Sequence, residues 1–287
     1  MNENCCVLYN PLSSSGNGEM LAKKLSEILP DSNIRYVDIT SFSDYKTFFD
    51  FLPRGEKLII AGGDGTLNRF VNEAELFIGG MKLYYYPCGT GNDFIRDIEK
   101  ADAKEPVEIS EAIKNLPVIK VNGLTKKFLN GIGYGIDGYC SETGEKLREK
   151  SSRPVNYTMI AIKGMLFGYN PTCADVTVDG KKYSFKDVWL APSMNGRFFG
   201  GGMMPTPLQK RGSDTLSCMV WHGKNRLKTL MLFPKIFKGE HVKNEKAVSI
   251  MTGKSITVSF DRPVALQIDG EVVPDVTSYT VNASTPF

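Results

Sequence analysis

The residues best suited to chemistry lie where a short apolar run meets a cluster of glycines. The run at 57–61 continues directly into Gly62, Gly63, Asp64, Gly65 and Thr66. Glycines let a backbone approach a ligand closely, and the N–H groups at the start of a helix attract anions. An aspartate in such a loop would repel a phosphate group unless a cation such as Mg²⁺ lay between them. The loop therefore indicates a nucleotide triphosphate site, or else a tight strand-to-helix turn capped by Thr66 or Asp64.

Two further segments repeat this order of apolar run, polar glycine turn and helix pattern. One occupies residues 86–94 and includes Thr90, Asn92 and Asp93, and the other occupies residues 10–16 and starts at Asn10. In a parallel sheet, all three loops would follow the carboxyl ends of strands, where open α/β sheets bind ligands. We therefore expect the three loops to converge on one edge of a sheet.

The elements around these loops support such a sheet over the first hundred residues. Short apolar runs at 5–9, 34–39 and 82–86 are typical of strands, and the apolar spacing at 18–29 is typical of an amphipathic helix. Strands that alternate with helices imply a parallel sheet with helices on its faces.

The pattern changes after Pro117, where short strand candidates dominate, among them 127–129, 255–260 and 264–268. Asn122-Gly123 and Asp179-Gly180 are hairpin signals, and helical stretches at 138–150 and 156–167 interrupt the strands. We expect an α/β domain at 1–117 and a mainly β, sandwich-like domain at 118–287. The last few residues are candidates for a return to the first domain.

The composition excludes several classes of protein. With 41% apolar and 23% charged residues, the 287-residue chain is neither collagen-like nor disordered. Two histidines, His222 and His241, argue against a multi-histidine metal centre and a histidine-based triad. The net charge of +3 is too small for a dedicated nucleic-acid-binding protein, so we expect no nucleic-acid partner. Six cysteines without a C-x-x-C pair predict free thiols in a reducing cytosol.

Taken together, the motifs resemble those of the diacylglycerol kinase catalytic family, which includes bacterial lipid kinases, sphingosine kinases and ceramide kinases. Six segments carry the resemblance in chain order: Asn10-Pro11, 62–66, 87–94, 130–137, 200–205 and 267–271. The resemblance covers nearly the whole chain. It implies a nucleotide-binding α/β domain, a β-sandwich-like lipid domain, and an active site in the cleft between them.

The resemblance also implies roles for individual residues. Seven residues would hold or border the ATP phosphates: Asn10, Gly62, Gly63, Gly65, Thr66, Thr90 and Asn92. Four acids would organise Mg²⁺: Asp64, Asp93, Asp137 and Glu271. Asp269 would be the general base that accepts the proton of the lipid hydroxyl, with Asp64 as its rival and Glu271 as a further catalytic carboxylate. The local alternatives are a D-G hairpin turn for Asp269, a helix-dipole acid for Asp93 and an N-cap for Asp137.

Two segments depart from the family pattern. The family's D-G-x-L-D segment, whose acids hold a structural Mg²⁺ in some bacterial members, becomes Ser213-Asp214-Thr215-Leu216-Ser217, so we expect no structural metal there. In the first loop, the family's N-P-x-S-G pattern becomes Asn10-Pro11-Leu12-Ser13-Ser14, and the first glycine follows only at Gly16.

The resemblance predicts an ATP- and Mg²⁺-dependent lipid kinase of phospholipid biosynthesis, with diacylglycerol as the default acceptor and phosphatidic acid as product. Because the implied substrate is a lipid, we expect a cytoplasmic protein that associates peripherally with the inner face of the membrane. Since bacterial relatives form dimers, we also expect that this chain could form a homodimer. The stretch at 226–238 mixes Leu, Met and Phe with lysines and is either a bilayer-docking surface or an ordinary amphipathic helix. Alternatives are an NAD kinase, which shares the loop at 62–66, and a catalytically idle lipid- or nucleotide-binding protein.

Overall fold

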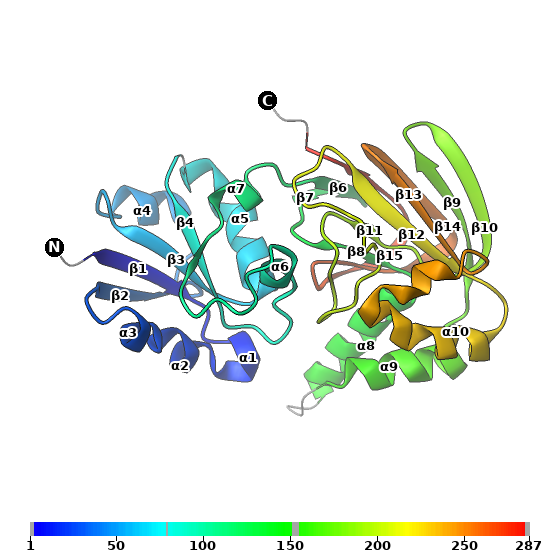
Figure 1. Cartoon of the computed structure of the whole chain (residues 1–287), viewed down its shortest axis with the longest axis horizontal. Helices are drawn as coiled ribbons and strands as arrows, with labels where there is room; N and C mark the ends of the chain where they lie inside the picture. Colours follow the sequence, from blue (N-terminus) through cyan, green and yellow to red (C-terminus); the bar gives the residue numbers. More distant parts are fainter. Residues whose placement is uncertain (1–2, 79, 151–154, 285–287) are drawn as a thin grey trace. The chain divides into compact units, whose positions relative to one another are not determined.

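A computed structural model of the chain describes residues 3–78, 80–150 and 155–284. The chain divides into two compact units, Met1–Asn115 and Leu116–Phe287. The boundary expected between residues 117 and 118 lies two residues further along the chain. Figure 1 shows the first unit in blue to green and the second in green to red.

The first unit is built on a five-stranded sheet in the order β2-β1-β3-β4-β5. Its strands are β1 (Asn4–Tyr9), β2 (Asn33–Asp38), β3 (Lys57–Gly62), β4 (Leu83–Pro87) and β5 (Val107–Glu108). Strands β1 to β4 pair in parallel, and only the edge strand β5 runs antiparallel. The apolar side chains of β1 and β3 are buried on both faces of the sheet. Continuous apolar runs of this kind are typical of a parallel sheet covered by helices on both sides.

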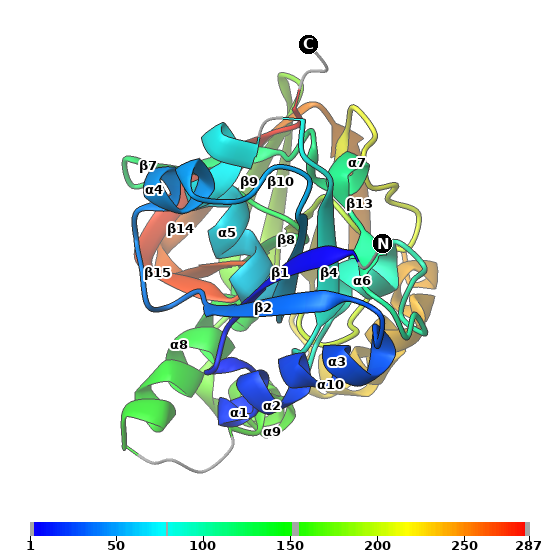
Figure 2. The same cartoon turned by 90° about the vertical axis from the view of Figure 1, so that its left-hand side faces the viewer.

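Helices cover both faces of this sheet, as expected. They are α1 (Ser13–Gly16), α2 (Gly18–Lys23), α3 (Leu25–Ile28), α4 (Tyr45–Asp50), α5 (Asp64–Ile78), α6 (Asp93–Asp97) and α7 (Ser110–Ile113). Figures 1 and 2 show α4 and α5 on one face and α1, α2 and α3 on the other. The single helix expected at 18–29 is in fact two short helices that meet at Lys24.

The second unit is built on a ten-stranded sheet. Its strands are β6 (Val118–Val121), β7 (Leu124–Lys127), β8 (Gly131–Tyr134), β9 (Thr172–Val178), β10 (Lys181–Leu190), β11 (Ser193–Met194), β12 (Leu216–His222), β13 (Val248–Gly253), β14 (Ser255–Ile268) and β15 (Glu271–Asn282). Strand β14 pairs with both β8 and β9, so part of the sheet closes on itself. A buried aromatic cluster of Tyr134, Phe260 and Tyr279 lies in its core. The expectation of a mainly β, sandwich-like domain is confirmed.

Turn chemistry explains the hairpins of this unit. Asn122-Gly123 and Asp179-Gly180 both adopt positive φ angles, which two-residue hairpin turns require, and both hairpins are confirmed. Strand β15 stays in the second unit, paired with β14 and β6. Residues 285–287, which include the candidates for a return to the first domain, lie outside the described residues.

Two expectations about strands are wrong, and one strand was not expected. The strand expected at 127–129 ends at Lys127, because β7 begins directly after the Asn122-Gly123 turn. The strands expected at 255–260 and 264–268 are one strand, β14, whose pairing with β15 changes register between Ser259 and Val264. The pattern between them includes Pro263, which cannot donate a backbone hydrogen bond to the sheet. Strand β8 was not expected, because its glycines look like a loop.

A layer of helices packs beside the strands of the second unit (Figure 1). It consists of α8 (Ile136–Lys150), α9 (Tyr157–Lys163), the π-turn η1 (Gly164–Gly168), α10 (Arg226–Leu232) and the 3-10 segments η2 (Phe233–Lys238) and η3 (Glu240–Lys243). Helix α8 lies so close to β14 that a Cβ atom on Gly138 would come within 1.8 Å of the Ala265 carbonyl oxygen. Among the described residues, no helix is both long enough and apolar enough to cross a membrane.

Candidate active site

The three polar loops of the first unit are joined to one another by hydrogen bonds. Asn10 donates from Nδ2 to the Thr66 hydroxyl at 2.9 Å, which links the loop after β1 to the loop after β3. Ser14 donates from its hydroxyl to the Cys88 carbonyl at 2.6 Å. The Cys88 N–H donates to the Gly62 carbonyl at 2.8 Å, which links the loops after β3 and β4. The expected convergence on one edge of the sheet is confirmed.

Packing explains some of the glycines in these loops and a positive φ angle accounts for Gly16, but neither accounts for Gly65. A Cβ atom on Gly89 would lie 2.6 Å from the Gly63 Cα, and one on Gly62 would lie 2.6 Å from the Thr66 Cβ. Side chains at these positions would force the loops apart. Gly65, in contrast, is exposed, and a Cβ atom there would meet nothing within 4 Å. The packing of the chain itself therefore gives no reason for glycine at position 65.

Asp64 connects two helices of the first unit. It is the first residue of α5, yet its carboxylate oxygens accept the N–H groups of Asp93 and Phe94, at 2.9 Å each. It therefore caps α6, whereas the alternative drawn from the sequence made it a cap of its own strand-to-helix turn. Asn92 precedes α6 in a left-handed conformation and exchanges two hydrogen bonds with Gly89.

The other predicted nucleotide residues lie in the same set of loops. Thr66 is buried under Asn10, whereas Thr90 is exposed at the end of the loop after β4. The Asp93 side chain is buried, and its carboxylate lies 3.5 Å from the Arg96 guanidinium. Asp93 is the first residue of α6, which agrees with the alternative that it is an acid favoured by the helix dipole. Its backbone N–H also donates to the Asp64 carboxylate.

In the second unit, Asp137 is a half-buried acid near the start of α8. Gln267 donates from Nε2 to Asp137 Oδ2 at 2.8 Å. Burial raises the pKa of the Asp137 carboxyl from 3.8 to about 6, and the Gln267 hydrogen bond lowers it only partly. Gly133 leaves space for this carboxyl, because a Cβ atom there would lie 1.6 Å from Oδ2. No lysine or arginine forms an ion pair with Asp137 in the described part of the chain.

Asp269 lies in a hairpin turn and also clamps a neighbouring segment. Asp269 and Gly270 both have positive φ angles, so the expected D-G turn joins β14 to β15. The carboxylate accepts three backbone N–H groups, from Leu129, Asn130 at 2.8 Å and Gly131 at 3.0 Å. The chain entering β8 is thus tied to the turn that carries the predicted base.

Arg211 completes this arrangement and was missed by the sequence analysis. Its guanidinium donates to the Leu129 carbonyl at 2.6 Å and to Asn130 Oδ1 at 2.8 Å. The segment at 129–131 is therefore held by Asp269 on its N–H groups and by Arg211 on its oxygens. Arg211 has no motif of its own, and only its position shortly after the 200–205 segment could have drawn attention to it.

Glu271 has a positive partner in the structure. Lys126, on β7, forms an ion pair with its carboxylate. Within the described ranges, no group of three histidines, cysteines, aspartates or glutamates could hold a metal ion. Asp64 and Asp93 belong to the first unit and Asp137 and Glu271 to the second, so neither unit alone assembles the four predicted Mg²⁺ ligands.

Neutral groups form the hydrogen-bond network around Ser217. Ser217 donates to Gln209 Oε1 at 2.6 Å, and Gln209 Nε2 donates to the Thr215 carbonyl at 2.9 Å. Asp214 turns outward and pairs with Lys254 at 2.9 Å. His241 is fully buried, and its Nε2 lies 3.0 Å from the Pro205 carbonyl oxygen, so it packs within the helical layer.

Comparison with known families assigns a match to each unit. The diacylglycerol kinase catalytic domain matches residues 4–122, and the YegS C-terminal NAD kinase beta sandwich-like domain matches residues 130–284.

Relatives are similar over most of their length. "Putative lipid kinase YtlR" of Bacillus subtilis (strain 168) is 25% identical over 276 residues, which cover 90% of this chain and 80% of the relative. "Diacylglycerol kinase" of Mycobacterium tuberculosis (strain ATCC 25618 / H37Rv) is 27% identical over 278 residues, with 92% and 87% covered.

A crystal structure described as a "putative diacylglycerol kinase" from Bacillus anthracis str. Sterne has the same fold. Its TM-score is 0.66 at 22% identity, with 98% of this chain and 93% of that chain covered. The motifs, the two domain matches and the named relatives agree with one another. The chain belongs to the diacylglycerol kinase family of lipid kinases, with a catalytic α/β domain followed by a YegS-type β sandwich-like domain.

Proposed function

We propose that this protein transfers the γ-phosphate of ATP, with Mg²⁺, to the hydroxyl group of a membrane lipid. Diacylglycerol is the proposed acceptor, and phosphatidic acid is the product. The reaction would take place at the inner face of the membrane, as a step of phospholipid biosynthesis. Gly65 is the observation that carries the nucleotide part of this proposal, because an exposed, unhindered glycine next to Asp64 leaves its backbone open to a phosphate.

The loops around Gly65 suit a phosphate chain. They hold N–H groups at the start of α5 and hydroxyl and amide groups on Asn10, Thr66 and Thr90. The hydrogen bonds between the loops keep them in place before the ligand arrives, so little ordering is left for binding to accomplish. Asp64 adds a negative charge beside the proposed phosphates, which requires a cation.

The carboxylates fit a cation that prefers oxygen ligands. Asp137 is the best fit, because desolvation disfavours its ionised form beside the neutral Gln267, and a bound cation would favour that form. Asp93 offers a fully buried carboxylate. Glu271 would have to exchange Lys126 for the metal. When bound, Mg²⁺ would neutralise charge on the phosphates during transfer.

Asp269 is the proposed base. The lipid hydroxyl oxygen forms a bond to the γ-phosphorus, the bond from phosphorus to the β-γ bridging oxygen breaks, and ADP leaves. The hydroxyl proton passes to the Asp269 carboxylate. Three backbone N–H groups fix the orientation of that carboxylate, which a proton acceptor needs. Asp64, held by two N–H groups, remains the rival base.

The test is a phosphoryl-transfer assay of the full chain with γ-labelled ATP. The acceptors are diacylglycerol, sphingosine, phosphatidylglycerol and NAD, each supplied with Mg²⁺ or with EDTA. The proposal predicts labelled phosphatidic acid from diacylglycerol, and only when Mg²⁺ is present.

Each other outcome has a distinct meaning. Labelled product from NAD would favour the NAD kinase alternative. No product with any acceptor would favour an idle binding protein. Label on sphingosine or phosphatidylglycerol alone would keep the lipid kinase and replace its substrate.

A further inference from the structure

The helical layer of the second unit exposes an unusual number of large apolar side chains. Of the large apolar side chains that are exposed in the described residues, seven belong to this layer: Leu147, Tyr157, Met159, Phe167, Leu227, Met231 and Phe237. Phe167 is 85% exposed and Met231 is 67% exposed. The elements that carry them follow one another in contact, from α8 to α9, η1, α10 and η2. Clustered apolar exposure of this kind marks a surface that interacts with another protein or with a membrane.

These side chains are not displaced members of the protein core. Helix α10 and η2 already bury Leu232 and Ile236 against the strands, and α9 and η1 bury Ile160 and Met165. Except for Leu147 on α8, the exposed side chains come from the same elements as these buried ones. The layer therefore has apolar side chains that pack on the strands and further apolar side chains that are exposed.

Positive charge is concentrated at the same place. Residues 224–246 contain seven lysines and arginines but two glutamates, a net charge of +5, whereas the whole chain carries +3. Lys235 and Lys238 extend from η2 beside the exposed Phe237. Neither forms an ion pair within the described ranges. The remainder of the chain is therefore slightly acidic, so the charge of this segment is a local feature.

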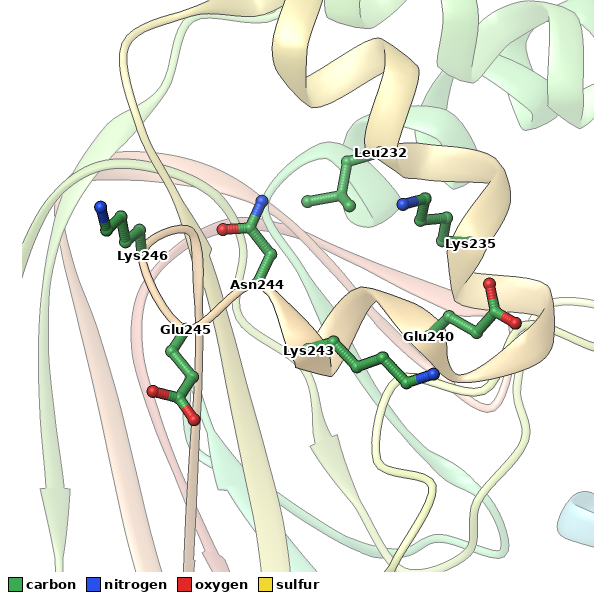
Figure 3. A pocket seen from close by; sticks show the side chains of 7 residues that line it. All are labelled: Leu232, Lys235, Glu240, Lys243, Asn244, Glu245 and Lys246. Carbon is green, nitrogen blue, oxygen red and sulfur yellow. The ribbon is translucent and has the colours of Figure 1, made fainter.

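A pocket of about 560 Å³ opens beside η2 and η3 (Figure 3). It is lined by Leu232, Lys235, Glu240, Lys243, Asn244, Glu245 and Lys246. Figure 3 shows Leu232 and the Asn244 amide between Lys235 on one side and Lys246 on the other. Three lysines and an amide are donors that suit a phosphate group, although Glu240 and Glu245 limit the positive charge of the pocket.

We propose that this helical face, together with the lysine-lined pocket, docks on the surface of a bilayer that contains anionic phospholipids. Leu227, Met231 and Phe237 would enter the boundary between head groups and acyl chains, while Lys235, Lys243 and Lys246 contact lipid phosphates. The positive charge of the face favours an anionic bilayer over a second copy of the chain, because two positively charged faces repel each other. The inference deepens the proposed function, since a lipid kinase has to reach a bilayer, but binding is measurable without turnover.

The test compares two triple variants in vesicle sedimentation without ATP. The first is Lys235→Gln/Lys243→Gln/Lys246→Gln, and the matched control is Lys46→Gln/Lys104→Gln/Lys114→Gln, which removes the same charge from exposed positions in the first unit. Vesicles contain phosphatidylglycerol and phosphatidylcholine, or phosphatidylcholine alone. Each lysine near an anionic surface contributes roughly fivefold in affinity, equivalent to about 1 kcal/mol.

We expect the first variant to lose roughly a hundredfold in affinity for the anionic vesicles, while the control variant stays close to the parent chain. Leu227→Ser/Met231→Ser should weaken binding as well, with circular dichroism used to verify folding. Equal binding to phosphatidylcholine alone, or equal losses in both triple variants, would overturn the proposal. A dimer in sedimentation equilibrium that Leu227→Ser/Met231→Ser abolishes would assign the face to a second copy and would also overturn it.

A kinase assay with detergent-dispersed diacylglycerol separates this inference from the proposed function. The lysine variant should retain its rate on the dispersed lipid and lose rate on diacylglycerol embedded in anionic vesicles. Activity lost on both would place the lysines in folding or in catalysis and contradict docking. If the parent chain binds anionic vesicles but phosphorylates neither form, the proposed function fails while docking stands.

Discussion

Gly65 differs from its neighbouring glycines in what a side chain at its position would touch. Gly62 and Gly89 are required by close contacts within the loops, whereas Gly65 has open space around it. The proposed phosphate ligand supplies a physical reason for a glycine at this position. Stability and kinetic measurements on a substituted chain can separate a glycine required by the fold from one required by a ligand.

We expect Gly65→Ala to keep or raise stability and to lower activity. Alanine in the first turn of α5 is favoured over glycine by about 0.5–1 kcal/mol, so the melting temperature should not fall. The KM for ATP should rise, because the added methyl group would lie where the phosphates approach. Gly80→Ala is the matched control, since Gly80 is also unhindered. Unchanged kinetics in Gly65→Ala would contradict the phosphate role of this loop.

Asp137 makes the stability of the protein depend on pH. Because its folded-state pKa is raised from 3.8 to about 6, the folded chain holds its proton more tightly than the unfolded chain. Below pH 3.8 both states are protonated and the burial has no electrostatic cost. As the pH rises through the folded-state pKa of about 6, stability is lost, up to about 3 kcal/mol.

Asp137→Asn should therefore stabilise the metal-free chain above pH 6 and abolish turnover. In urea unfolding with EDTA, the gain over the parent chain should grow from near zero at pH 4 to about 3 kcal/mol at pH 8. Asp175→Asn is the control: this half-buried strand carboxyl has its pKa lowered by Ser184 and Lys182, so its removal should give no stability gain that grows with pH. A gain that is the same at both pH values would contradict the raised pKa of Asp137, and full activity would remove Asp137 from the proposed Mg²⁺ ligands.

At the scale of elements, the turn between β14 and β15 has a structural twin. Asp179 also starts a D-G turn at positive φ, and its carboxylate also accepts backbone N–H groups, from Lys254 and Ser255. Asp269 makes the same kind of clamp on the segment entering β8. The two turns therefore share a structural role, and only Asp269 has a proposed catalytic one.

This pair separates clamping from catalysis. Asp269→Asn and Asp179→Asn should each lower the free energy of unfolding by about 1–3 kcal/mol, because an amide cannot accept all the N–H groups that the carboxylate accepts. Asp269→Asn alone should lower kcat by about a hundredfold or more while ATP binding, measured by calorimetry, is retained. Turnover that falls equally in both variants would show that Asp269 acts only through the fold.

Local patterns predicted the elements better than the contacts between them. The strand-to-glycine-to-helix order was sufficient to expect three loops at one sheet edge, and the D-G and N-G pairs were sufficient to expect hairpins. Strand β8 was not predicted, because its glycines leave space for the Asp137 and Met194 side chains, which come close only in the folded chain. The same holds for Asp64, which caps a helix 29 residues away in the sequence, and for Arg211, which reaches 81 residues back to Asn130.

At the scale of the whole molecule, the order of the two units was readable from the change in pattern near Pro117. The closure of the second sheet through β9 and β14 was not, because it joins strands about 80 residues apart whose local patterns contain no sign of their partner. The predicted acids are divided between the two units, so their joint action on Mg²⁺ stays a prediction. It can be tested only through the reaction that needs all of them.

The most direct test of the lipid kinase account is the balance between ATP consumed and lipid phosphorylated. The full chain is supplied with diacylglycerol, ATP and Mg²⁺, and ADP and phosphatidic acid are quantified from the same samples. The account predicts equal amounts of the two products, both lost when EDTA replaces Mg²⁺. ADP formed without phosphatidic acid, or a phosphorylated product from NAD under the same conditions, would contradict it.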